Sequence, residues 1–512
     1  MQTNALEMRN ITKRFGSVVA NRNVDLDVRK GEILSILGEN GSGKTTLMNM
    51  LSGIYYPDEG EILINGESVQ IASPQDAFRY KIGMIHQHFK LVDLFTAAEN
   101  IVLGIRDNRK FRLKEIEMEV GEIAHKYGFD IDPAKKIYDM AVSEKQTVEI
   151  IKVLYRGADI LILDEPTAVL TPQETQKLFA VLRRMKEDGK AIIIITHKLH
   201  EVLSISDRVA ILRKGEHIAT VDTCDATEAS LTEMMVGQKV SLNIKRSDPK
   251  DSTLRLQVEG LKCVNREGVT VLDNVSFSAF SGEILGIAGI AGSGQRELLE
   301  SIAGLQHINE GTIAYMDPET DEEVNLRDKT PAEIRELGVH LSFVPEDRLG
   351  MGLVGNMDIV DNMMLRSYSS GHSIFLSREE PKHLADKIID ELGVATPGPT
   401  TPVRRLSGGN VQKVLVGREI AAAPKLLMAA YPVRGLDINS SYQIYNLLNE
   451  QKEKGVCIIF VGEDLDVLME LCDRILVIGG GRVTGIVDGR KATKEEIGLL
   501  MTKTEGEGAD EE

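Results

Sequence analysis

An α/β fold built twice in tandem is predicted by three features of the 512-residue sequence. A glycine-rich stretch at 38–45 recurs at 289–296, which indicates an internal repeat. Short apolar runs such as 33–37 and 160–163 alternate with helical patterns, as in folds that bury a parallel sheet. The chain is also longer than one hydrophobic core usually organises, so two large domains are expected.

The spacing between repeated positions locates these domains. Gly38 and Gly289 are 251 residues apart, whereas His197 and Glu463 are 266 apart, so the second half holds the additional residues. We expect a first domain at 1–240, a linker at 241–253, a second domain at 254–503 and an acidic tail at 504–512. The tail is expected to be a solvated, disordered end.

The composition argues against several classes of protein. A formal net charge of −18 is unfavourable for a nucleic-acid partner, because phosphate contacts need clustered Lys and Arg. No apolar run approaches the roughly 20 residues that cross a bilayer, and residues 1–10 contain no signal-peptide core, so any membrane association is expected to be peripheral. The four cysteines lack CxxC spacing and are expected to be reduced thiols in the cytoplasm.

The first glycine-rich stretch has the form of a phosphate-binding loop (P-loop). It follows the apolar run 33–37 and precedes apolar residues at helical spacing, which predicts strand, loop and helix in order. Backbone N–H groups and the helix N-terminus then bind nucleotide phosphates, Lys44 neutralises their charge, and the Thr45 hydroxyl is placed to ligate Mg²⁺. A glycine-rich turn with an incidental lysine is the alternative. The predicted phosphate-binding residues are Gly38, Glu39, Asn40, Gly41, Ser42, Gly43, Lys44, Thr45 and Thr46.

Two carboxylates follow a second apolar run. Residues 160–163 lead directly into Asp164 and Glu165, which places both at the carboxyl edge of a parallel sheet, where ligands bind in α/β folds. Asp164 is expected to contact Mg²⁺, directly or from the second shell, and Glu165 to orient and deprotonate the attacking water. A solvated acidic pair that caps a strand is the alternative.

Two further polar residues are predicted to serve the same edge. The apolar run 191–196 leads to His197, whose neutral imidazole can donate to a γ-phosphate oxygen and hold the water for Glu165. The amide of Gln87 can reach Mg²⁺ or water. His86 and His88 flank Gln87, but no third ligand at metal spacing accompanies them, which argues against zinc.

Phe15 precedes the P-loop strand and is a candidate for adenine binding. Its π face would stack on the base. Ordinary packing in the core is the alternative for an isolated aromatic side chain.

The motif order resembles that of an ATP-binding-cassette (ABC) ATPase in duplicate. P-loop, Gln87, a third motif at 140–144, Asp164 with Glu165, and His197 follow one another, and equivalent positions occur in the second half. The resemblance covers nearly the whole chain and implies two tandem P-loop ATPase domains with ATP and Mg²⁺ as cofactors. Each would contain a RecA-like α/β core, an antiparallel β subdomain and a helical subdomain that carries the signature motif.

The second half has lost the groups that its P-loop chemistry needs. Hydrolysis there is not expected, because phosphate and Mg²⁺ charge would be uncompensated and two added carboxylates would repel a γ-phosphate. The backbone of this loop either still holds phosphate or is now only a structural turn. The changed positions, in motif order, are Gln295, Arg296, Glu346, Ala430, Tyr431 and Glu463.

The signature motif shows the opposite asymmetry. The second half keeps Ser407, Gly408 and Gly409 ahead of a helical pattern, whereas the first half has the degenerate sequence 140–144, in which Glu144 adds a carboxylate. Lobes of ABC dimers pack head to tail, so the resemblance implies that this positive helix end contacts ATP held by the opposite lobe. One complete ATP site is therefore predicted between the lobes, together with one degenerate site.

The finer resemblance is to the ATPase subunits of bacterial importers for simple sugars and nucleosides. The features that carry it are the degenerate second lobe, the strand end 429–432, and residues 345–348. Residues 86–92 with 99–101 are more similar to the nucleoside branch. Import of monosaccharides such as ribose or galactose is the alternative.

The resemblance also implies partners and a location. They are two transmembrane permease subunits, which dock beside the Gln87 and Glu346 segments, and an extracytoplasmic substrate-binding protein (a lipoprotein). The chain would lie peripherally on the cytoplasmic face of the bacterial cell membrane and touch the membrane only through the permeases. An alternative of another class is a soluble tandem ABC translation factor, although the acidic balance and short linker disfavour it.

Overall fold

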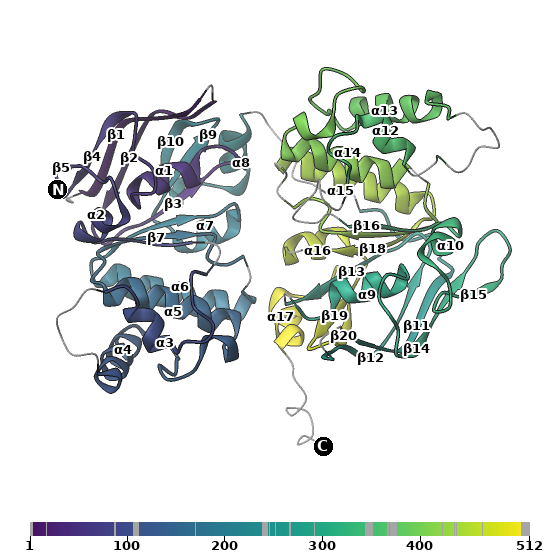
Figure 1. Ribbon diagram of the computed structural model, residues 1–512, viewed down its shortest axis with the longest axis horizontal. Helices are drawn as coiled ribbons and strands as arrows, with labels where there is room; N and C mark the ends of the chain where they lie inside the picture. The colour runs from purple at the N-terminus through teal and green to yellow at the C-terminus, as the bar shows by residue number, and fades with distance from the viewer. Residues whose placement is uncertain are drawn as a thin grey trace. The chain divides into compact units, whose positions relative to one another are not determined.

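The computed structural model divides the chain into two compact units, Met1–Ser241 and Leu242–Glu512 (Figure 1). Each unit is an α/β assembly of two sheets with helices, which confirms the predicted fold class of two tandem α/β lobes. The described residues are 4–16, 18–86, 89–105, 112–168, 170–237, 244, 246–250, 252–265, 268–290, 292–343, 352–365, 368, 376–421, 423–434, 436, 438–462 and 464–502.

The first unit begins with an antiparallel hairpin and then alternates strands with helices. Its strands are β1 (Asn4–Phe15), β2 (Val18–Arg29), β3 (Ile33–Leu37), β4 (Glu59–Ile64), β5 (Glu67–Val69), β6 (Ile82–Ile85), β7 (Ile160–Asp164), β8 (Ala191–Ile195), β9 (Arg208–Arg213) and β10 (Glu216–Asp222). Its helices are α1 (Lys44–Leu51), α2 (Pro74–Arg79), α3 (Ala97–Val102), α4 (Leu113–Tyr127), α5 (Val142–Tyr155), α6 (Pro172–Glu187), α7 (Leu199–Ile205) and α8 (Glu228–Val236).

Two sheets organise the described part of this unit. One is antiparallel, in the order β2-β1-β4-β5, and the other has the order β10-β9-β3-β8-β7-β6. In the second sheet β6, β7, β8, β3 and β9 are parallel and only β10 pairs antiparallel at the edge. Because parallel strands share one direction, the loops after β3, β7 and β8 leave the same edge.

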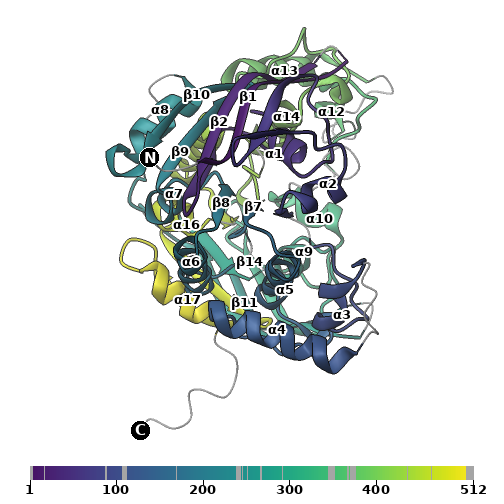
Figure 2. The same ribbon diagram turned by 90° about the vertical axis from the view of Figure 1, so that its left-hand side faces the viewer.

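The central strands are almost entirely apolar because both faces of their sheet are buried, and the one buried hydroxyl of β3, on Ser35, is hydrogen-bonded to that of Ser206. Ile193 and Ile195 pack with α1 and the antiparallel sheet, whereas Ile192 and Ile194 pack with α5 and α6. Figure 2 shows α4, α5 and α6 below β7 and β8, with α1 above. A further apolar cluster joins α3, α4 and α5 into a helical layer.

The second unit repeats this plan. Its antiparallel sheet has the order β12-β11-β14-β15, and its mainly parallel sheet has the order β16-β17-β18-β13-β19-β20. The strands are β11 (Leu254–Val264), β12 (Thr270–Phe280), β13 (Ile284–Gly289), β14 (Glu310–Met316), β15 (Glu323–Asn325), β16 (Val339–Phe343), β17 (Leu426–Ala430), β18 (Cys457–Val461), β19 (Arg474–Gly479) and β20 (Arg482–Asp488). The helices are α9 (Gln295–Ile302), α10 (Pro331–Glu336), α12 (Ile359–Met364), α13 (Glu379–Glu391), α14 (Gly408–Ala421), α15 (Ile438–Glu453), α16 (Leu465–Leu471) and α17 (Lys494–Thr502).

The described part of the predicted linker packs against the second unit. Ile244 is buried in the cluster that contains α14 and α15, and the Lys452 ammonium donates to the Ser247 carbonyl at 2.5 Å. The predicted acidic tail at 504–512 lies outside the described residues. Among the described residues, no helix combines the length and apolar character that a bilayer crossing requires.

Candidate functional site

The loop after β3 is shaped by two glycines that no other residue could replace. A Cβ at Gly38 would meet the Leu212 carbonyl oxygen at 2.3 Å and the Ser42 hydroxyl at 2.4 Å. Gly43 has a φ of +95°, and a Cβ there would lie 2.5 Å from the Ala20 carbonyl oxygen. The loop therefore folds tightly back on the sheet and delivers its backbone to the start of α1, as expected for a P-loop.

Lys44 lies inside this loop. Its ammonium donates to the carbonyl oxygens of Gly38, at 2.6 Å, and Glu39, at 3.0 Å. Burial lowers the pKa of Lys44, while Glu165, Asp164 and Glu39 act in the opposite direction. The structure thus brings together the lysine and both carboxylates that the sequence predicted. A cation held among carbonyls, beside the exposed Thr45, is poised to exchange these contacts for phosphate oxygens.

Glu165 occupies a strained turn at the end of β7. Its φ is 48°, an unusual conformation for a residue with a Cβ, and its N–H donates to the Ile195 carbonyl at 2.8 Å. This turn aims the carboxylate at the end of β8, where the Nδ1 atom of His197 lies 3.0 Å from Oε1 of Glu165. The two predicted catalytic residues are therefore direct neighbours.

The adjacent carboxylates have opposite pKa shifts. Burial, together with the charge of Glu165, raises the pKa of Asp164 to about 6, although Lys44 opposes this. Burial alone would also raise the pKa of Glu165, but the hydrogen bond and charge of His197, with Lys44, outweigh it and lower that pKa. Two neighbouring carboxylates with separated pKa values are typical of a site that divides binding and base roles between them.

The oxygen donors at this edge fit a magnesium ion that is shared with a nucleotide. Thr45 lies on the first turn of α1 and Asp164 at the end of β7, so the chain offers a hydroxyl and a carboxylate, and phosphates and water would complete the coordination. Gln87, the third predicted magnesium ligand, lies outside the described residues. The described residues contain no cluster of three or more His, Cys, Asp or Glu side chains that could hold a metal by themselves.

Phe15 ends β1 and is not a core residue. The residue is 43% exposed and its ring contacts Tyr55, with the ring centroids 5.1 Å apart and the planes at 71°. Lys13 lies over the same ring, with its ammonium 5.6 Å from the centroid. The ring is therefore exposed at the surface and is not packed in the core.

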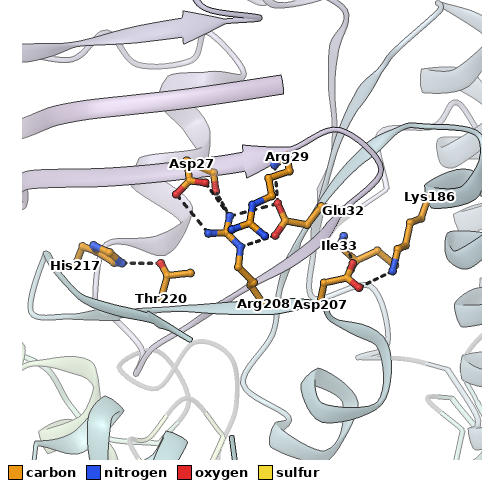
Figure 3. A network of polar contacts seen from close by, with 9 residues as sticks. All are labelled: Asp27, Arg29, Glu32, Ile33, Lys186, Asp207, Arg208, His217 and Thr220. Carbon is orange, nitrogen blue, oxygen red and sulfur yellow. Dashed lines mark hydrogen bonds and ion pairs between the residues drawn. The ribbon is translucent and has the colours of Figure 1, made fainter. Parts of the chain in front are cut away.

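An ionic network around the buried pair Arg208 and Glu32 fixes the end of β3 that lies away from the P-loop (Figure 3). Arg208 donates to Glu32 at 2.5 Å and to Asp27 at 2.9 Å. Asp207 accepts from the Ile33 N–H at 2.9 Å and from Lys186 at 2.5 Å. Burial would lower the pKa of Arg208, but the hydrogen bonds that its guanidinium donates to Glu32 and Asp27 outweigh this effect and raise that pKa, so the guanidinium stays charged.

The loop after β13 keeps the shape of a P-loop without its chemistry. Gly294 has a φ of +102°, close to that of Gly43. Gln295 is buried in the position of the lysine, and its amide donates to the Ile290 carbonyl at 3.1 Å. Arg296 turns along α9 and pairs with Glu300 at 2.7 Å. A neutral amide therefore takes the place that a cation holds in the first unit.

The second unit also lacks the two carboxylates at the end of the equivalent strand, β17. Ala430 is buried at the end of β17, and Tyr431 follows with a φ of 52° and an N–H that donates to the Val461 carbonyl at 2.8 Å. The strained turn has thus been kept while the carboxylates have gone. Glu346 and Glu463 lie outside the described residues.

The signature segment of the second unit begins α14. Ser407 and Gly408 are exposed, and the Ser407 hydroxyl accepts from the side-chain amide of Asn410 at 2.8 Å. A Cβ at Gly409 would meet Leu436 at 3.5 Å, which is ordinary contact, so this glycine is not required for space. The exposed backbone at this helix start is suited to an anion.

The degenerate segment of the first unit differs in charge from the sequence-based expectation. Both carboxylate oxygens of Glu144 lie 2.8 Å from the Lys135 ammonium, and one accepts from the Ala141 N–H at 2.7 Å. The carboxylate is therefore compensated and caps α5, instead of presenting a free negative charge.

One pair of contacts was not anticipated from the sequence. Gln146 on α5 donates from its side-chain amide to the Pro166 carbonyl, and Gln412 on α14 does the same to Pro432, each at 2.5 Å. Both amides are buried, and each ties a signature helix to the residues after an acidic strand. Their equal position in the two halves was the available signal, since Gln146 lies two residues after the segment 140–144 and Gln412 two residues after the equivalent segment 406–410.

A family model described as ABC transporter matches residues 21–168 and again 272–432, once in each unit. The two matches contain the P-loop and acidic strand of each half.

Curated relatives match over almost the full length. The chain is 43% identical to the guanosine import ATP-binding protein of Bacillus subtilis, over 97% of each chain. It is 39% identical to a ribose import ATP-binding protein of Rubrobacter xylanophilus, over 97% of this chain and 98% of the relative. A solved structure of an archaeal ribosome recycling factor, in complex with a ribosomal stalk protein, covers 94% of this chain and 90% of that chain with a TM-score of 0.61. Its sequence identity is 17%, so this likeness concerns the fold alone.

Proposed function

Because this chain belongs to the ABC transporter family, with one cassette in each half, we propose that it is the ATP-hydrolysing subunit of a bacterial importer for nucleosides. The observation that carries the proposal is the grouping of Lys44, Asp164, Glu165 and His197 in the first unit. The full-length similarity to an importer of guanosine supports the choice of solute class.

We propose that the first unit binds ATP through residues 38–46 and Phe15, and that it holds Mg²⁺ through Thr45, Asp164 and Gln87. The ion would neutralise phosphate charge and orient the triphosphate. Glu165 would then take a proton from the attacking water. His197, which contacts Glu165, would hold the carboxylate and the water in position relative to each other. The buried ammonium of Lys44 donates to loop carbonyls in this structure and would donate to phosphate oxygens when ATP is bound.

The second unit would contribute binding without cleavage. Ser407, Gly408 and Gly409 start a helix and would contact the γ-phosphate of ATP held by the first unit. The neutral Gln295 and the apolar Ala430 support the absence of hydrolysis at the second P-loop. One catalytic site and one degenerate site per chain follow from this division.

Exposed apolar side chains support docking to permease subunits. Among the described residues between β6 and α4, the exposed large apolar ones are Val92, Leu94, Phe95, Leu103 and Ile105, and among those between β16 and α13 they are Val354, Met357, Tyr368 and Leu376. Apolar side chains exposed in this way would be removed from water by a protein contact. We propose that two transmembrane permeases bind these segments on the cytoplasmic face of the membrane, and that an extracytoplasmic lipoprotein delivers the solute.

Uptake by a deletion strain tests the solute class. Complementation with this chain should restore accumulation of radiolabelled guanosine, and complementation with Glu165→Gln should not. Restored uptake of ribose without guanosine would instead support the monosaccharide importer, which the ribose relative at 39% identity keeps as a second candidate. Purification with ribosomal particles, and not with permeases, would contradict both.

A further inference from the structure

Phe15 and Tyr55 form an aromatic pair beside the P-loop helix. Phe15 is the last residue of β1, and Tyr55 lies in the turn that follows α1. Their ring centroids are 5.1 Å apart at 71°, an edge-to-face arrangement, and the residues are 43% and 37% exposed. Such a pair orients both rings, because edge-to-face contacts favour one relative geometry.

The backbone of this turn attaches Tyr55 firmly to α1. The N–H groups of Ile54 and Tyr55 both donate to the Asn49 carbonyl, at 2.9 and 3.1 Å. Helix α1 begins with Lys44 and ends at Leu51, so the helix together with the turn that follows it connects the phosphate lysine to the tyrosine. Any ring that packs on Tyr55 is thereby held relative to the P-loop.

Polar contacts bind the end of β1 to the same turn. The Lys13 ammonium donates to the Tyr56 carbonyl at 2.7 Å and to Asp58 at 2.9 Å, and Asp58 also accepts from the Arg14 N–H at 2.6 Å. Lys13 lies over the Phe15 ring as well, 5.6 Å from the centroid. Tyr55 and Lys13 therefore restrict the ring of Phe15 while its exposed surface remains available.

The second unit has the same turn without the aromatic pair. The N–H groups of Leu305 and Gln306 both donate to the Glu300 carbonyl, at 2.7 and 3.2 Å, so Gln306 is the counterpart of Tyr55. Strand register makes Asn265 the counterpart of Phe15, because Val264 pairs with Thr270 as Arg14 pairs with Val19. The turn therefore forms without either ring.

Loss of both rings coincides with loss of the phosphate lysine. The lobe that has Lys44 has Phe15 and Tyr55, and the lobe that has Gln295 has neither. We propose that Tyr55 is a positioning residue that holds the ring of Phe15 against the flat base of the nucleoside triphosphate. The proposal rests on the proposed function, in which the first unit binds ATP and Phe15 stacks on its base.

The test uses the importer complex, with ATPase activity measured against ATP concentration. Tyr55→Gln copies the residue that the equivalent turn of the second unit accommodates, and Tyr55→Phe keeps the ring contact. We expect Tyr55→Gln to raise KM for ATP about 3- to 10-fold with kcat within about twofold, the range for loss of one aromatic contact. Tyr55→Phe should leave KM close to that of the parent complex, and so should the matched control Gln306→Ala.

Magnesium tripolyphosphate, which has no base, separates positioning from a general effect on the loop. Its inhibition constant should be unchanged by Tyr55→Gln. In a complex that already carries Phe15→Ala, the further change Tyr55→Gln should not raise KM for ATP any more. If Tyr55→Gln weakened the binding of tripolyphosphate and of ATP equally, or left KM for ATP unchanged, the proposal would be overturned. The complex with Lys44→Ala reports on the proposed function independently, because activity that survives it would refute ATP hydrolysis in the first unit whatever Tyr55 does.

Discussion

The Nδ1 atom of His197 lies 3.0 Å from Oε1 of Glu165. The two residues come from different strand ends, β7 and β8, and the backbone N–H of Glu165 is itself bonded to Ile195 on β8. The contact lowers the pKa of Glu165 against the effect of its burial. A carboxylate that stays ionised in a partly buried site is suited to accept a proton from water.

Substitution Glu165→Gln should therefore lower the ATPase kcat of the importer complex by about 10²- to 10⁴-fold, the usual contribution of a general base. The amide keeps the shape but cannot take the proton, so KM for ATP should change little. Steady-state phosphate release measures both constants. Tyr431→Phe is the matched control, since Tyr431 occupies the same strained turn in the second unit; an equal loss of activity there would contradict a single catalytic site.

The two signature segments should differ in their importance. Ser407→Ala removes the hydroxyl at the start of α14 and should lower kcat by at least about 10-fold, the order of loss for an electrostatic donor near the reacting phosphate. Ala141→Ser restores a hydroxyl at the degenerate segment and should leave kcat unchanged. Both are measured in the same ATPase assay. Full activity in Ser407→Ala would rule out the proposed site shared by the lobes.

Local sequence patterns predicted the parts of the fold that depend on neighbours in the chain. The runs 33–37 and 160–163 form the buried strands β3 and β7, because strands covered on both faces consist almost entirely of apolar residues. The contacts of Lys44 with its own loop follow from the same short segment. Spacing alone thus located the lysine and the acidic pair.

Contacts between distant segments could not be predicted in this way. Nothing near Phe15 in the sequence indicates that Tyr55, beyond the P-loop helix, packs on its ring. Likewise, Glu144 reads as an unfavourable carboxylate until the fold places Lys135 beside it. Such contacts depend on how turns bring distant segments together, and hydrophobic periodicity predicts only the local secondary structure.

The ionic network around Arg208 should be important for stability. The side chains of Arg208 and Glu32 are only 9% and 5% exposed, so Arg208→Met leaves a buried carboxylate without its partner. We expect the first unit to lose about 3–5 kcal/mol of unfolding free energy. Urea titration followed by circular dichroism measures this, because the chain has no tryptophan.

Two further variants separate charge from packing. Adding Glu32→Gln to Arg208→Met removes the uncompensated charge and should recover part of the loss. Arg22→Met breaks an exposed ion pair with Glu216 and should cost no more than about 1 kcal/mol. If Arg208→Met cost as little as Arg22→Met, the buried network would not hold the strand.

The charge of Asp164 should oppose folding when no magnesium nucleotide is bound. Its pKa is raised to about 6 in the folded protein, against 3.8 as the ordinary value. Well below pH 3.8 the group is protonated whether the chain is folded or unfolded, so it does not affect stability. Between pH 4 and 6 the unfolded chain releases the proton first, and stability falls as pH rises. Above pH 6 the full penalty is present.

In buffer with EDTA and no nucleotide, Asp164→Asn should therefore stabilise the first unit at pH 8, by about 2–3 kcal/mol, and have little effect near pH 4. Thermal unfolding at both pH values measures the difference. Asp159→Asn, at the other end of the same strand, is the matched control: Lys81 and Lys190 lower the pKa of Asp159, so this change should slightly destabilise at pH 8. A gain from Asp164→Asn that is equal at both pH values would show that side-chain size, and not charge, sets the effect.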